Sequence, residues 1–178
     1  WILIILFLVI IGPAFYGQNH NQVYYDLVGT LPDNLESVKA GNALENDFDM
    51  GATHVILASS DLNSKDARNL ENEISDVDGV KLALGLDSFV GPTVPKDMIP
   101  DDIKEMLDNG KYQMIYVISE YKTGSDEVNA QCDAIRDIIK KYDDTAMLIG
   151  EAPCTEDLIT ITNTDFNTVN AVSIILIF

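Results

Sequence analysis

The chain has 178 residues and a formal net charge of −18, with 29 acidic against 11 basic residues. A surface this acidic repels phosphate backbones, so we expect no nucleic acid among its partners. All of the Lys and Arg residues lie between Lys39 and Lys141, and none stands beside the apolar ends of the chain. Because cytoplasmic loops carry excess Lys and Arg close to the membrane, this pattern predicts a domain on the extracytoplasmic side of the cell membrane.

The N-terminal stretch, Trp1 to Ile11, is wholly apolar. At about 1.5 Å per residue it covers roughly 16 Å of a ~30 Å hydrocarbon core. We interpret residues 1–16 as the end of a transmembrane helix, in a chain cut inside one membrane helix and again inside the next. A secretory signal peptide is the alternative, since its apolar region has about this length. No basic residue precedes the apolar run, however, and GPAFYG is a poor cleavage site.

Residues 17–52 are expected to form a linker and a short helix. The polar run from Gln18 to Gln22 marks the predicted exit from the membrane, and Pro32 suits the first turn of the helix. Three residues at helical spacing give this helix one apolar face: Leu35, Val38 and Leu44.

Residues 53–153 contain two β-α-β patterns in series. The first begins with a β-branched strand at His54 to Ser59, and Asn63 or Ser64 caps the helix that follows. A strand at Val80 to Leu86 completes this unit, which has about the usual ~30 residues.

The second pattern has a strand at Lys111 to Tyr121, a helix at Asp126 to Tyr142 capped by Ser125, and a returning strand at Thr145 to Ile149. Two such units predict an α+β fold, a ferredoxin-like β-α-β-β-α-β sandwich with its helices on one face of a four-stranded sheet. The excursion between them, Asp87 to Gly110, is where we expect contact with a partner subunit or substrate.

Residues 154–178 are predicted to form a helix leading into the next transmembrane segment. Thr155 caps its start, and Glu156 and Asp157 lie in the first turn, where carboxylates favour the helix dipole. From Ala171 onward the polar face disappears. The α+β domain is therefore expected to be tethered to a lipid bilayer at both ends.

The two cysteines, Cys132 and Cys154, could form a disulfide in an extracytoplasmic compartment. Cys132, however, continues the apolar face of the helix at Asp126 to Tyr142. A buried thiol acting as a small hydrophobic residue is therefore the favoured interpretation.

No residue pattern indicates catalysis, a cofactor or a metal, so we do not expect an enzyme. Asp47-x-Asp49-x-Gly51 resembles the start of a calcium loop but lacks the distal ligands, which favours a solvated acidic turn. His20 and His54 have no partner at zinc-ligand spacing, and His54 is interpreted as a strand-edge residue. Glu151 is a single carboxylate without a visible mate for acid–base chemistry.

The order of these segments resembles a known family. The matching segments begin with a helix opened by Leu31-Pro32-Asp33, followed by Phe48 before the strand HVILAS and then by two β-α-β units. After them come Gly150-x-Ala152 and Asp157, which lead a helix back to the membrane. This order is similar to the first extracytoplasmic loop of resistance-nodulation-division (RND) superfamily exporters, particularly the MMPL-type members. The resemblance covers essentially the whole chain, although its individual motifs are loose.

The resemblance implies a proton-driven exporter of lipids or amphiphilic compounds, in which this loop forms part of the substrate path. Its partners would be the bilayer, the remainder of the same transporter chain and a hydrophobic or amphiphilic substrate. The proton-carrying residues would lie in other transmembrane helices, so none is assigned here. Two other interpretations stay open: a membrane-tethered extracytoplasmic sensor or binding domain, and a protein-translocation accessory of the same superfamily.

Overall fold

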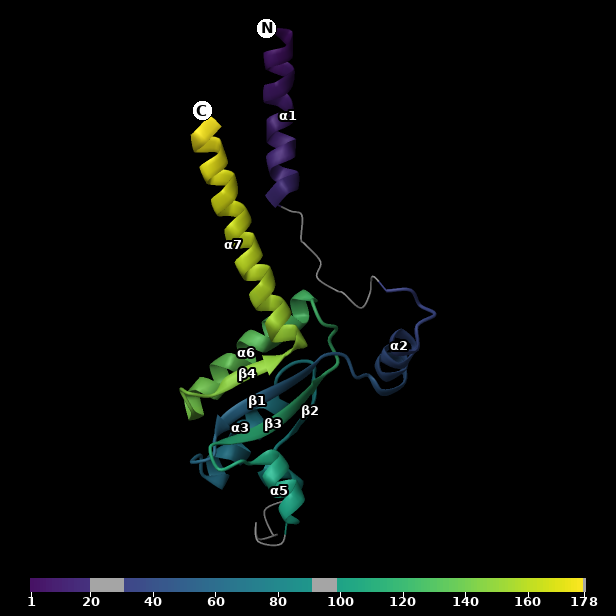
Figure 1. The fold of residues 1–178 in the computed structure, drawn as a ribbon, viewed down its shortest axis with the longest axis vertical. Coiled ribbons are helices and arrows are strands. Elements are labelled where there is room, and N and C mark those ends of the chain that lie inside the picture. The colour runs from purple at the N-terminus through teal and green to yellow at the C-terminus, as the bar shows by residue number, and fades with distance from the viewer. Residues whose placement is uncertain (20–30, 91–98, 178) are drawn as a thin grey trace.

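A computed structural model describes residues 1–19, 31–90 and 99–177. The described elements follow one another along the chain as α1 (Ile2–Asn19), α2 (Glu36–Phe48), β1 (Thr53–Ser59), α3 (Ser64–Ser75), β2 (Val80–Leu84), α4 (Leu86–Val90), α5 (Asp101–Leu107), β3 (Tyr112–Ser119), α6 (Asp126–Tyr142), β4 (Met147–Gly150) and α7 (Glu151–Ile177). Figure 1 shows an α+β domain from which α1 and α7 extend toward the same side.

The four strands form one sheet in the order β2-β3-β1-β4, and all three neighbouring pairs are antiparallel. β1 is central: it pairs with β3 along its whole length and with β4 over four positions. The α+β class predicted from the sequence is confirmed.

The core lies between one face of the sheet and helices α3 and α6, which stand behind the sheet in Figure 1. Alternate residues of β1 and β3 point into it, as the period of a strand requires. The buried cluster is aliphatic and draws on both helices and three strands: Ile56, Leu70, Ile74, Ala83, Ile115, Val117, Ile135 and Ile139.

The predicted starts of both core helices are confirmed. The Asn63 side chain accepts hydrogen bonds from the backbone N–H groups of Lys65 and Asp66, at 3.1 and 3.0 Å. The Ser125 hydroxyl accepts one from the N–H of Val128 at 3.2 Å. These caps satisfy N–H groups that have no partner within the helix.

The start of α7 was predicted wrongly. The helix begins at Glu151, directly after β4, so Thr155 lies inside the first turns and caps nothing. Gly150 makes this abrupt change of direction: its φ is 147°, and a Cβ there would lie 2.7 Å from the carbonyl oxygen of Thr53. The second strand is also shorter than expected, because α4 begins at Leu86.

Two predicted features lie wholly or partly outside the described residues. The polar exit at Gln18 to Gln22 is described only up to Asn19, and His20 lies beyond it. The excursion at Asp87 to Gly110 is described except for residues 91–98 and contains α5, which begins directly after Pro100.

Helices α1 and α7 carry large apolar side chains that face solvent. Trp1 is 97 % exposed and Leu176 is 80 % exposed. Within residues 1–19, 31–90 and 99–177, no helix combines the length and the apolar character that crossing a membrane demands.

Candidate functional site

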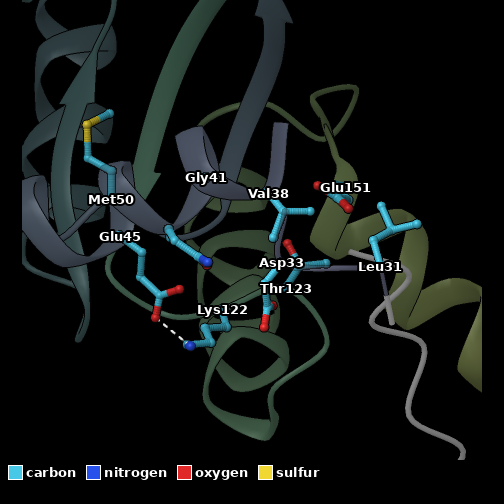
Figure 2. A pocket seen from close by; sticks show the side chains of 11 residues that line it. Leu31, Asp33, Val38, Gly41, Glu45, Met50, Lys122, Thr123 and Glu151 are labelled. Carbon is cyan, nitrogen blue, oxygen red and sulfur yellow. Dashed lines mark ion pairs between the residues drawn. The ribbon is translucent and has the colours of Figure 1, made fainter. Parts of the chain in front are cut away.

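A cavity of about 310 Å³ lies where α2, the β3–α6 connection and the first residue of α7 meet. Figure 2 shows its lining from close by. Each of these three segments contributes to its walls, as does the approach to β1: Leu31, Asp33, Val38, Gly41, Asn42, Glu45, Met50, Gly51, Lys122, Thr123 and Glu151. Such a volume is at the small end of the range for ligand pockets, about 300–1,000 Å³.

The lining combines apolar and acidic side chains. Lys122 Nζ lies 2.6 Å from Glu45 Oε1, and Figure 2 shows the two groups pointing toward one another. Asp33 and Glu151 add two further carboxylates, so the eleven lining residues carry three acidic groups and one lysine. The cavity therefore suits a small amphipathic molecule with hydrogen-bond donors or positive charge better than an anion.

Gly51 fixes the wall of the cavity next to the sheet. Its N–H donates to the carbonyl of Ser119 at 2.8 Å, and the N–H of Ala52 donates to the carbonyl of Tyr121 at 2.8 Å. A Cβ on Gly51 would lie 2.3 Å from the Tyr121 oxygen, a distance that no side chain tolerates. The segment between α2 and β1 is thus held against the end of β3 by close backbone contact.

The base of α7 lies beside this cavity and is fastened to α6. Arg136 Nη1 is 2.6 Å from Glu156 Oε2, and Arg136 Nη2 is 3.6 Å from Asp157 Oδ1. Below this pair a small apolar cluster joins α7 to α6 and to the start of β1: Ala52, Val128, Cys132 and Ala152. Glu151 at the cavity and Glu156 at the ion pair therefore lie in the same first turns of α7, so a movement of this helix base would affect both.

The ion pair at the base of α7 gives a testable prediction. Replacing Arg136 with alanine is expected to lower the free energy of unfolding by about 1–2 kcal/mol, because the pair is neither fully buried nor fully exposed. The side chains of Arg136 and Glu156 are 25 % and 17 % exposed. Urea unfolding measures the change.

The control for that measurement is Lys141→Ala. Lys141 pairs with Glu73 at 3.1 Å, but both side chains are largely exposed. Its loss should cost less than about 0.5 kcal/mol. Equal losses for the two variants would show that the Arg136 pair does not hold α7 to the domain.

His54 is a buried polar residue that was misplaced by sequence reasoning. It lies in the central strand β1, fully buried, rather than at a strand edge. Its Nε2 is 3.3 Å from Gln131 Oε1, and Gln131 Nε2 donates to the carbonyl of Asp78 at 2.7 Å. Burial lowers the pKa of His54 below its ordinary value of 6.5, so the neutral ring is favoured. The alternation His54, Ile56, Ala58 was the signal that could have placed it inward.

The cysteines behave as the favoured interpretation predicts. Cys132 is buried and Cys154 is exposed, and both are free thiols. Burial raises the pKa of the Cys132 thiol to about 12, which makes it unreactive.

In the acidic turn before β1, α2 ends at a residue with left-handed backbone conformation. Asp49 has a φ of 51° at the C-terminus of α2, and its carboxylate lies 3.6 Å from Lys81 Nζ. Across the described ranges, no group of three or more His, Cys, Asp or Glu side chains is placed to hold a metal ion.

No protein-family model matches this chain, and no curated protein sequence matches it. The cavity and the base of α7 are therefore interpreted from their own geometry. Of the residues singled out in the sequence, Gly51 and Glu151 meet at the cavity, whereas His54 lies in the core.

Proposed function

We propose that this chain is the extracytoplasmic domain of a proton-driven membrane exporter of lipids or amphiphilic compounds, with a ferredoxin-like fold. The strand order supports the fold, because β1 and β2 are parallel to one another with β3 between them. β3 and β4 have the same relation across β1. Each helix α3 and α6 thus connects the two strands of a split β-α-β unit, as in a β-α-β-β-α-β sandwich.

One observation carries the membrane part of the proposal: the domain continues into helices whose far ends are apolar, uncharged and exposed. From Ala171 to Ile177 α7 has one hydroxyl and no charge, and Ile175 and Leu176 are among its most exposed side chains. α1 is equally apolar near Trp1, and both helices extend toward the same side in Figure 1. A bilayer is the environment that would cover both ends at once.

The cavity supports the substrate-path part of the proposal. It lies between the domain and the helix that would lead to the membrane, and its lining is part apolar and part acidic. A shift of α7 would move Glu151 relative to the other walls. The remainder of the transporter chain would supply the residues that carry protons.

Flotation with phospholipid vesicles tests the membrane part. The wild-type chain should float with neutral phosphatidylcholine vesicles, and the double variant Ile175→Asp, Leu176→Asp should float at least tenfold less, because charges in hydrocarbon are costly. The matched control is Leu44→Asp, Met106→Asp, which changes exposed apolar residues of α2 and α5 and should float like the wild type. Wild-type chain left in the dense fraction would contradict the proposal.

Photolabelling tests the substrate path. A diazirine-bearing amphiphilic amine, added to the chain in vesicles, should label peptides that contain Met50 and Thr123 from the cavity wall. Labelling confined to α1 and α7 would mean that the amphiphile meets the chain only in the bilayer.

The same cavity also favours the second candidate function, a membrane-tethered sensor or binding domain. A sensor needs a binding site joined to a membrane helix, and the cavity touches α7 at Glu151. The two functions differ in specificity. Labelling displaced by many unrelated amphiphiles supports an exporter, and labelling displaced by one compound class supports a sensor.

A further inference from the structure

The face of the sheet turned away from α3 and α6 is apolar. Strand alternation and the pairing register bring together side chains from all four strands on this outer face: Val55, Leu57, Leu82, Leu84, Met114, Tyr116, Ile118, Met147 and Ile149. The remaining outward positions, Thr53, Ser59 and Tyr112, lie at the strand ends and are also uncharged. These positions are uncharged, and charge borders them at the irregular end of β2, where Lys81 lies 3.3 Å from Glu120 and 3.6 Å from Asp49.

Such a face is unusual for a sheet that meets water. A half-exposed antiparallel sheet alternates apolar inward and polar outward residues, but these strands are apolar on both sides. Tyr116 is 38 % exposed, Leu82 40 % and Met147 43 %. A contiguous apolar patch of this kind marks an interaction site.

The orientation of the outer face favours a protein over a lipid surface. Figure 1 views the sheet with this face toward the reader, while α1 and α7 extend upward, across the line of sight. Under the proposed function, on which this step rests, a bilayer would lie at the far ends of these helices. It would therefore not cover the outer face.

We propose that the outer face docks against the same face of a second copy of this chain. A largely apolar sheet face matches the same face of a second copy in a twofold dimer. Two sheets packed face to face stand about 10 Å apart and interdigitate their side chains. A twofold axis running along α7 would leave the helices of both copies pointing the same way, as two chains in one bilayer require.

Area and charge set the strength of this dimer. Four strands at ~4.8 Å spacing and about six residues at ~3.4 Å form a plate of roughly 400 Å². Protruding side chains add to this flat area, so packing the two sheet faces together removes on the order of 1,000 Å² of accessible surface in total. This is near the lower limit for a specific interface. Each copy also has a net charge of −18, which opposes association. The dimer is therefore weak and strengthens with salt, which screens that repulsion.

Thiol crosslinking of the full chain in detergent tests the interface without requiring a membrane. In a Cys154→Ser background, Tyr116→Cys places a thiol on the outer face, while Cys132 stays buried. A bismaleimide of about 10 Å reach should join two copies across the packed sheets. The matched control is Leu44→Cys on α2, 47 % exposed and remote from the sheet face. Crosslinking at Tyr116→Cys should exceed the control at least tenfold. It should also rise between 50 and 500 mM salt, concentrations below and above the roughly 0.1 M at which the screening length is ~10 Å. Equal crosslinking at both positions overturns the proposal.

Sedimentation of the uncrosslinked chain gives the second measurement. Tyr116→Asp should raise the dissociation constant of the dimer at least tenfold, while thermal unfolding of the diluted monomer changes little because the side chain is partly exposed. A wild-type chain that stays monomeric at high salt overturns the dimer, whatever vesicle flotation shows. Conversely, a dimer that forms in detergent stands even if the chain fails to bind vesicles.

Discussion

Replacing Gly51 with alanine is expected to lower the free energy of unfolding by about 3 kcal/mol, at the upper end of overpacking effects. The new methyl group would lie 2.3 Å from the carbonyl oxygen of Tyr121 and 2.9 Å from that of Glu120. Both neighbours are backbone atoms at the end of β3, so neither can rotate away. Relief requires moving the chain, which breaks the hydrogen bonds of Gly51 and Ala52 to β3. Urea unfolding followed by circular dichroism measures the loss.

Gly41→Ala is the matched control, with an effect of opposite sign. Gly41 lines the same cavity but lies inside α2, and a Cβ there meets no atom within 4 Å. Alanine in a helix interior is favoured over glycine by roughly 0.5–1 kcal/mol, so this variant should be more stable than the wild type. If both variants lose stability equally, the effect arises from filling the cavity and not from the close backbone contact of Gly51.

Acidification is expected to destabilise the domain through His54. Burial lowers the folded-state pKa of His54, while the unfolded chain protonates near the ordinary value of 6.5. Arg136 on α6 lowers the pKa further, and the hydrogen bond to Gln131 opposes the shift. The stabilisation is thus fully present above about pH 6.5 and declines as the pH falls toward the folded-state pKa, by at most about 1.4 kcal/mol per pH unit.

His54→Gln isolates this contribution. Glutamine keeps hydrogen-bonding capacity toward Gln131 but does not titrate, so the stability difference between wild type and variant should change between pH 7 and 5. Carboxylates, and His20 outside the described residues, are common to both chains and cancel in the difference. A difference that stays constant across this range would show that His54 does not control the acid response of the core.

Several parts of the fold that depend on neighbouring residues were predictable from the sequence, although α2 begins at Glu36 and Pro32 lies before its first turn, contrary to the prediction. Asn63 and Ser125 cap their helices by bonds to residues two or three positions away, and the periodicity of α6 gave both of its ends. The start of α7 was missed because Thr155, by its local chemistry, is as good a cap as Asn63 or Ser125. Pairing of β4 with β1 instead carries the chain into the helix at Glu151 without a loop.

The cavity and the complete burial of His54 could not be predicted in the same way. Residues of α2 and the β3–α6 connection that line the cavity, such as Glu45 and Lys122, are far apart in sequence and meet only through tertiary packing. The alternation of His54 with Ile56 and Ala58 is local and places its side chain inward. Its complete burial also requires β3 and β4 on either side of β1, and no local pattern contains that strand order.

The direct passage from β4 into α7 makes that helix a lever arm. Its 27 residues reach about 40 Å at 1.5 Å per residue, with the fulcrum at Gly150. A tilt of about 5° at the fulcrum would displace the far end sideways by roughly 3–4 Å over that length. No loop lies between β4 and α7 to absorb the motion. A displacement of a few ångström at the far end of α7 therefore corresponds to a shift of less than about 1 Å at Glu151 and the cavity wall.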